Sequence, residues 1–125
     1  MKHAVNWFEI PVLDFDRARS FYEFIFNYKM SIPVNEANIK MGLLPAEPGA
    51  VNGSIVWHTD FYKPSAEAGP LLYLNGNPDL NSIQERIVAG GGNILIAKRQ
   101  VSPQFGYMAV FMDSEGNRLA LHSDH

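Results

Sequence analysis

Hydrophobic and polar positions alternate along residues 5–12, VNWFEIPV, and this period of two predicts a β-strand. One face of that strand is apolar and consists of Phe8, Ile10 and Val12. The other face is mixed and consists of Trp7, Glu9 and Pro11. A carboxylate inside a buried strand needs a polar partner, so Glu9 is the first candidate for a working group.

The pattern then changes to a helical period over residues 14–30, DFDRARSFYEFIFNYKM. Apolar side chains recur every three or four residues and form one stripe, which consists of Ala18, Phe21, Tyr22, Ile25 and Phe26. We expect Asp14 or Asp16 to cap the start of this helix, where an acidic group also favours the helix dipole.

The second half of the chain repeats this order. Residues 69–74 predict a strand, and residues 77–92 predict a helix that starts near Pro78 and ends at the glycines 90–92. The apolar stripe of this second helix consists of Leu80, Ile83, Ile87 and Val88. Short strands follow each helix, and they are expected at residues 37–45, 54–58, 106–113 and 118–122.

The repeat predicts an α+β fold of two tandem βαβββ modules whose sheets curl around a cleft. We expect a single domain, with module 1 at about residues 1–60, a linker at about 59–69 and module 2 at about 69–125. The linker, TDFYKPSAEAGP, is polar and rich in helix and strand breakers. A half of this size cannot bury its sheet alone, so the two halves should fold together.

Composition narrows the possible partners. Hydrophobic residues make up 46% of the 125 residues, which is enough for a folded core. With a formal net charge of −3 and no basic stripe, no nucleic-acid partner is expected. No apolar run approaches the roughly 20 residues of a membrane helix, and without a signal sequence we expect a cytoplasmic protein. The chain has no cysteine, so any metal site would need His, Asp or Glu ligands.

Two motifs carry a resemblance to a known family. The helix start D-x-x-R-A-x-x-F-Y at residues 14–22 and the turn D-x-E-G-N at residues 113–117 resemble the vicinal oxygen chelate superfamily. That superfamily contains glyoxalase I, bleomycin-resistance proteins and extradiol dioxygenases. The resemblance covers nearly the whole chain and implies two βαβββ modules around a cleft that binds a small organic ligand. It also implies a homodimer.

The resemblance also implies where metal ligands would stand. Metal-dependent members carry them on the first and last strand of each module, and the matching positions here are Trp7, Val56, Gly69 and Ala120. None of these side chains offers the nitrogen or oxygen donor that a divalent ion needs. We therefore expect no metal cofactor at the usual position.

Polar and aromatic side chains nearby are the candidate ligand contacts. Alternation along the strands places most of them on the same faces as the four positions above. They are Trp7, Glu9, His58, Tyr73, Arg118 and His122. Glu9 is the candidate acid–base group, and an ion pair with Arg118 is its alternative role. Tyr107 is a further candidate, although the register of its hairpin decides whether Tyr107 or Met108 faces the ligand.

Three hypotheses of function follow. The first is a metal-independent protein that binds a small organic molecule in the cleft. The second is a divalent-metal lyase, isomerase or dioxygenase with shifted ligands Glu9, His58 and His122, displaced by roughly 6.6 Å along the strands. The third is an inert partner-binding module whose cleft is collapsed.

Overall fold

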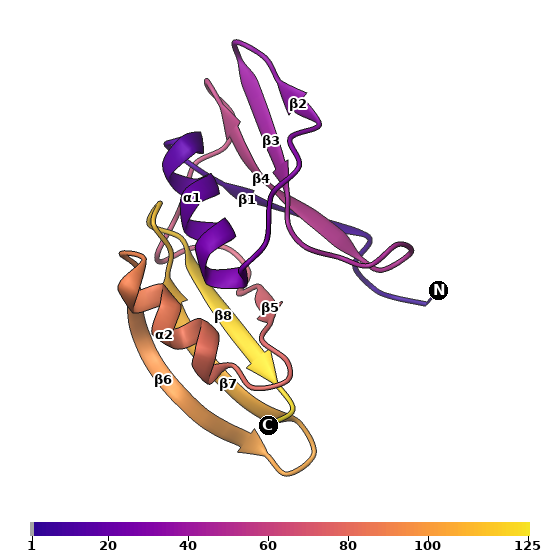
Figure 1. The fold of residues 1–125 in the computed structure, drawn as a ribbon, viewed down its shortest axis with the longest axis vertical. Helices are drawn as coiled ribbons and strands as arrows, with labels where there is room; N and C mark the ends of the chain where they lie inside the picture. The colour runs from indigo at the N-terminus through magenta and orange to yellow at the C-terminus, as the bar shows by residue number, and fades with distance from the viewer. Residues whose placement is uncertain (1) are drawn as a thin grey trace. The chain divides into compact units, whose positions relative to one another are not determined.

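The computed structural model describes residues 2–125, so Met1, the expected start of module 1, lies outside the described residues. The chain divides into two compact units, Met1–Pro64 and Ser65–His125. Each unit contains a strand, a helix and three further strands, in that order (Figure 1). The predicted α+β fold with two βαβββ modules is confirmed. The described residues include no helix long and apolar enough to cross a membrane.

The first unit is a four-stranded sheet with one helix, α1 (Phe15–Phe26). Its strands are β1 (Trp7–Pro11), β2 (Val34–Asn35), β3 (Ile39–Leu43) and β4 (Asn52–His58). The strand order is β1-β4-β3-β2, with β1 parallel to β4 and the other pairs antiparallel. Because β1 and β4 are parallel, the chain must cross over between them, and α1 lies in that crossover.

Helix α1 begins and ends where its residue types favour it. The side chain of Asp14 accepts a hydrogen bond from the backbone N–H of Arg17 at 3.0 Å, which confirms Asp14 as the N-cap. Asn27 ends the helix with a left-handed backbone, at φ 52°. The residues of the predicted stripe are buried except Phe26, which is half-buried in the last turn.

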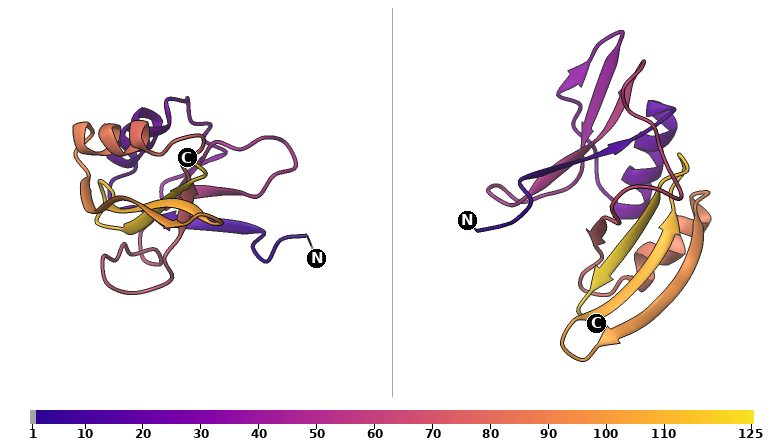
Figure 2. Two further views of the ribbon diagram at one scale, coloured as in Figure 1. Left: turned by 90° about the horizontal axis from the view of Figure 1, so that it is seen from below. Right: turned by 180° about the vertical axis from the view of Figure 1, so that it is seen from behind.

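The second unit repeats the element order of the first. Its elements are β5 (Tyr73–Asn75), α2 (Asn81–Ala89), β6 (Asn93–Ser102), β7 (Gly106–Met112) and β8 (Arg118–Ser123). Its β6 and β7 are longer than the corresponding strands β2 and β3. The strand order is β5-β8-β7-β6, and β6 and β7 form a long curved hairpin (Figure 2). Strand β5 begins later than the predicted residue 69, because Gly69 has φ +90° and Pro70 has no N–H to donate.

Helix α2 buries a narrower stripe than predicted. Leu80, Ile83 and Ile87 are buried, but Val88 is 59% exposed. Successive helical residues are about 100° apart, so Val88 turns away from the face that carries Ile87. The prediction that Val88 belongs to the core is therefore wrong.

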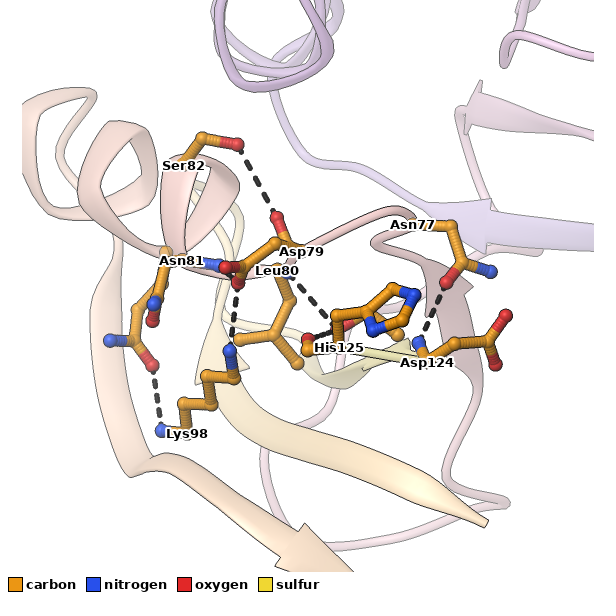
Figure 3. A network of polar contacts seen from close by, with 10 residues as sticks. Asn77, Asp79, Leu80, Asn81, Ser82, Lys98, Asp124 and His125 are labelled. Atoms are coloured by element: carbon orange, nitrogen blue, oxygen red, sulfur yellow. Dashed lines mark hydrogen bonds and ion pairs between the residues drawn. The ribbon is translucent and has the colours of Figure 1, made fainter. Parts of the chain in front are cut away.

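The start of α2 is held by side chains from other parts of its unit (Figure 3). Leu80, the residue before the helix, has no side-chain cap, and its buried N–H donates to Oγ of Ser123 at 3.1 Å. Asp79 accepts a hydrogen bond from Nζ of Lys98 at 2.8 Å, and this bond lowers the pKa of the Asp79 carboxyl. The N–H of Asn81 donates to Oδ1 of Asp79 at 2.9 Å, so Asp79 and Ser123 of β8 together bind the first N–H groups at this helix start.

In each unit the helix covers an apolar sheet face, and in the second unit the opposite face is also partly buried, by a cluster of Met108, Val110 and Ala120. In β1, Ile10 is buried while Trp7 is 43% exposed, so the two faces differ as the alternation predicts. In the second unit, Leu74 and Leu121 are buried on the corresponding face. The opposite faces are left for the candidate functional residues.

Candidate functional site

The helix-free face of the first sheet carries most of the candidate residues of its unit. We call it the Glu9 face, and it consists of Trp7, Glu9 and Pro11 with their partners in β4, which are Asn52, Ser54 and Val56. Residues that pair across neighbouring strands point to the same side of a sheet. The strand register therefore places these six side chains on one surface.

The carboxylate of Glu9 is exposed and binds two neutral donors. The hydroxyl of Tyr62 donates to Oε1 at 2.5 Å, and the indole Nε1–H of Trp7 donates to Oε2 at 3.4 Å. Within residues 2–125, Glu9 has no lysine or arginine partner in an ion pair. Among the described residues, the charge of this carboxylate is thus stabilised by hydrogen bonds from neutral donors.

Tyr62 reaches Glu9 because the chain turns back after β4. Glu9 pairs with Ser54, which lies four residues before the end of β4 at His58. At about 3.3 Å per residue, Ser54 and the neighbouring Glu9 lie roughly 13 Å from the end of β4. Tyr62, four residues beyond His58, spans this gap only if its segment returns along the sheet. The bond to Glu9 also raises the pKa of the Tyr62 hydroxyl.

His58 organises the turn that brings Tyr62 back. Its Nδ1 accepts hydrogen bonds from the backbone N–H groups of Asp60 and Phe61, both at 3.1 Å. Its ring packs against the rings of Phe61 and Tyr62, with centroids 6.4 Å and 6.1 Å away. Since Nδ1 is an acceptor, the neutral imidazole carries its proton on Nε2. His58 therefore acts here as a turn-forming residue within an aromatic cluster.

Ser54 is the unusual polar residue on this face. It is fully buried, and its Oγ is the one buried side-chain atom in residues 2–125 that lacks a hydrogen-bond partner. Its Cα is in register with that of Glu9. A buried hydroxyl without a partner is uncommon and calls for a physical explanation.

The second unit places its candidates on a comparable face. Tyr73 pairs with Ala120, and His122 pairs with Met108, so these residues share one side of the sheet. Tyr73 is 49% exposed. The ring Nε2–H of His122 donates to the carbonyl oxygen of Phe105.

Arg118 and Tyr107 are placed by the same hairpin. Nη2 of Arg118 donates to the carbonyl oxygen of Gly69 at 3.5 Å. Tyr107 pairs with Ser123, so it points to the side opposite His122, and Nζ of Lys98 lies 4.7 Å from its ring centroid. Of the two residues that the sequence left open, the register places Met108, and not Tyr107, on the face of His122.

The four positions that metal ligands would occupy do not fit a divalent ion. Val56 and Ala120 are fully buried hydrocarbon, and Gly69 has no side chain. The indole N–H of Trp7 is a donor and already binds Glu9. Across residues 2–125, no group of three or more His, Asp or Glu side chains is placed to hold a metal ion.

The D-x-E-G-N turn has a structural role. Oδ1 of Asp113 accepts hydrogen bonds from the backbone N–H groups of Glu115 and Asn117, at 2.9 and 2.8 Å. The side chain of Asn117 in turn accepts a hydrogen bond from the N–H of Ser65 at 3.3 Å. This turn thus positions β7, β8 and the start of its own unit.

Tyr62 is the residue of the site that sequence reasoning did not select. It belongs to the linker, where no periodic pattern assigns a face to any side chain. The signal available was the aromatic pair Phe61 and Tyr62 in an otherwise polar segment. Ser54 also gave no signal, because a serine in a strand is ordinary and its missing partner depends on the folded register.

Comparisons with known proteins find this fold among solved structures. No family model matches the chain, and a search of curated proteins finds no match. A glyoxalase/bleomycin resistance protein/dioxygenase domain from Frankia sp. EAN1pec is 18% identical, with a TM-score of 0.73 and 100% coverage of both chains. TnmS3, an antibiotic binding protein from Streptomyces sp. CB03234, is 22% identical, with a TM-score of 0.65 and coverage of 98% and 96%.

A V278E mutant of glyoxalase I from Zea mays matches with a TM-score of 0.71 and 16% identity. The match covers 94% of this chain and 45% of the maize chain, so this chain spans less than half of the maize protein. At these identities, the similarity demonstrates a shared fold.

Proposed function

We propose that this chain, which has the fold of the glyoxalase, bleomycin-resistance and dioxygenase proteins, binds a small organic molecule at the Glu9 face without a metal ion. The observation that carries this proposal is the pairing of an exposed indole, Trp7, with a carboxylate, Glu9, that two hydrogen bonds hold in place. Aromatic walls with a few oriented polar groups are typical of small-molecule sites. That one structure of this fold is an antibiotic binding protein supports the same class of function.

Metal independence rests on the chemistry of the side chains. The positions of the expected ligands hold indole, isopropyl, hydrogen and methyl groups, and none of these coordinates a divalent ion. In the alternative set of Glu9, His58 and His122, both histidines already use a ring nitrogen. Nδ1 of His58 accepts two backbone hydrogen bonds, and Nε2 of His122 donates one.

Metal content tests this part of the proposal. The purified chain is incubated separately with zinc, nickel, manganese and ferrous ions, desalted and analysed for bound metal. We expect far less than about one ion per chain, with no difference between the wild type and the Glu9→Ala and His122→Ala variants. Stoichiometric metal that both substitutions remove would overturn the proposal and support the metal-dependent alternative.

Ligand binding is tested through the two tryptophans. Small aromatic compounds are titrated against the chain while tryptophan fluorescence is recorded. We expect Trp7→Phe to abolish the response and Trp57→Phe to preserve it, because Trp57 lies on the opposite side of the sheet and contacts Lys40, whose Nζ is 5.6 Å from its ring. A fluorescence change that Trp57→Phe abolishes and Trp7→Phe preserves would show that the ligand does not bind at the Glu9 face.

The remaining expectations stay predictions. Tyr73, Arg118 and His122 are predicted ligand contacts in the second unit, and a homodimer is predicted from the resemblance. Light scattering during gel filtration measures the mass of the assembly, and a monomer at all concentrations would contradict the dimer. The cytoplasmic location is checked by fractionation of cells that express the chain.

A further inference from the structure

We propose that the ligand of the Glu9 face is an organic ammonium ion, which binds Glu9 in place of the Tyr62 hydroxyl. This inference rests on the proposed function, since it names the chemical class of the ligand of that same site. Four observations support it: the unpaired charge of Glu9, the exposed aromatic rings around it, the buried hydroxyl of Ser54, and the way Tyr62 occupies the carboxylate.

The charge of Glu9 favours a cationic ligand. Both of its hydrogen-bond donors, the indole of Trp7 and the phenol of Tyr62, are neutral. A carboxylate has about four acceptor positions, so two donors leave room for more. An ammonium group would add a charge-assisted hydrogen bond and neutralise the carboxylate, whereas an anionic ligand would be repelled.

The rings beside Glu9 favour a cation that carries an apolar group. Trp7, whose indole binds Glu9, is 43% exposed, and Phe61, which is 81% exposed, packs against the ring of Tyr62 with centroids 5.8 Å apart. The faces of aromatic rings attract ammonium ions, with indole the strongest. A flat or apolar substituent on the ligand would cover these rings and remove them from water.

Ser54 supplies a second acceptor for the same ligand. Its buried Oγ lacks a partner within residues 2–125, and its strand position is beside Glu9. A primary ammonium group has three N–H donors, so one group can bond the carboxylate and the hydroxyl together. The missing partner of Ser54 is thereby explained as a contact that the ligand completes.

Tyr62 occupies the carboxylate in the absence of the ligand. Its hydroxyl donates to Oε1 of Glu9, where an ammonium N–H would bond. The strand partner of Glu9, Ser54, is fully buried. Ligand binding therefore requires Tyr62 to leave, and removal of its hydroxyl should make binding tighter. The direction of the change in affinity distinguishes the two roles of Tyr62. Removal of a competing group tightens ligand binding, whereas removal of a ligand contact weakens it.

The test uses three probes that share one aromatic ring and differ in charge: benzylamine, benzyl alcohol and benzoate. Each is titrated at neutral pH into the full chain, and the indole N–H signals of Trp7 and Trp57 are followed by nuclear magnetic resonance. Trp7→Phe assigns the two signals. We expect benzylamine to shift the Trp7 signal and to bind at least about tenfold more tightly than benzyl alcohol. Benzoate should bind most weakly.

The variants test each role separately. Glu9→Gln should remove the preference for benzylamine over benzyl alcohol, because the amide keeps the shape and loses the charge. Ser54→Ala should weaken benzylamine binding and leave benzyl alcohol binding nearly unchanged. Tyr62→Phe should tighten benzylamine binding by about fivefold, since a competing hydrogen bond of about 1 kcal/mol is removed. Trp57→Phe serves as the matched control and should change nothing.

Two results would overturn the inference. Equal or tighter binding of benzyl alcohol or benzoate, with a shift of the Trp7 signal, would reject the ammonium ion and leave the proposed function intact. Weaker benzylamine binding by Tyr62→Phe would show that the Tyr62 hydroxyl does not compete with the ammonium group for Glu9. If none of the three probes shifts the Trp7 signal at millimolar concentration, the inference fails together with the proposed Glu9-face site.

Discussion

The hydroxyl of Tyr62 donates a hydrogen bond to Glu9, a residue 53 positions away in the chain. This contact joins the linker to β1 and brings an aromatic ring over a carboxylate. It is a charge-assisted bond at an exposed position, so its net contribution to stability should be modest. Its consequences for stability and for the pH dependence of stability can be measured.

We predict that Tyr62→Phe lowers the free energy of unfolding by about 1 kcal/mol at neutral pH. The bond raises the pKa of Tyr62, so its contribution is present below the ordinary pKa of tyrosine and is lost as the pH rises through the raised value. Urea unfolding should therefore show that the difference in the free energy of unfolding between Tyr62→Phe and wild type is smaller at alkaline pH than at neutral pH. Tyr73→Phe, at an exposed position, is the control and should match the wild type at both pH values.

Glu23 should support the fold at acidic pH. Its Oε2 accepts hydrogen bonds from the backbone N–H of Met30 at 2.8 Å and from Nε of Arg19 at 3.3 Å. The bond from Met30 is the main cause of a lowered pKa of Glu23. A lowered pKa means that the contribution is present above the ordinary pKa of glutamate and is lost as the pH falls through the lowered value.

We therefore predict that Glu23→Gln costs about 1 kcal/mol at neutral pH and that this cost disappears in acid. Urea unfolding at a series of pH values from neutral to acidic measures the effect. Glu85→Gln, at an exposed position of α2, should leave the pH profile unchanged. A constant difference between Glu23→Gln and wild type at every pH would contradict the assignment.

Gly53 should be intolerant of a side chain because of Phe8. The two residues are paired in β4 and β1, and a Cβ at Gly53 would lie 2.5 Å from Cγ and Cδ2 of Phe8. We predict that Gly53→Ala destabilises the fold by about 1–3 kcal/mol, because a ring cannot bend away as a flexible side chain can. In the Phe8→Leu background the same substitution should cost less, and urea unfolding of the four proteins completes a double-mutant cycle. If the losses of unfolding free energy from Gly53→Ala and Phe8→Leu simply add, the ring of Phe8 is not what excludes a side chain at Gly53.

Ser123 should stabilise the start of α2. Its Oγ accepts a hydrogen bond from the buried N–H of Leu80 and donates one to the carbonyl oxygen of His125. We predict that Ser123→Ala costs about 1–3 kcal/mol, because the N–H of Leu80 is left buried without a partner. Hydrogen exchange at Leu80 should accelerate in the variant. Ser82→Ala, whose hydroxyl is exposed and makes a long 3.5 Å contact, should show neither effect.

Local patterns predicted the elements well where one physical rule dominates. The period of the apolar residues identified both helices, and the capping preference of aspartate limited the start of α1 to Asp14 or Asp16, of which Asp14 is the cap. Alternation along β1 assigned Trp7 and Glu9 to one face and Ile10 to the other. These features depend on residues close together in the sequence, so they can be predicted without knowledge of the tertiary structure.

Predictions failed where the outcome depends on distant partners. Val88 fits the helical stripe at its edge, but the unit buries only a narrow face of α2, so the side chain stays exposed. The sequence left open whether Tyr107 or Met108 shares the face of His122, because a register shift of one residue between β7 and β8 exchanges them.

Periodicity and side-chain chemistry are local properties, so the amino-acid sequence was sufficient to predict the two βαβββ modules and to show that Trp7, Val56, Gly69 and Ala120 carry no metal-binding side chain. The bond between Tyr62 and Glu9, and the buried hydroxyl of Ser54 that lacks a partner within residues 2–125, became visible only in the folded unit. Both depend on a strand register and a chain reversal that bring together residues far apart in sequence. Such contacts form when the whole unit is folded, so no short pattern encodes them.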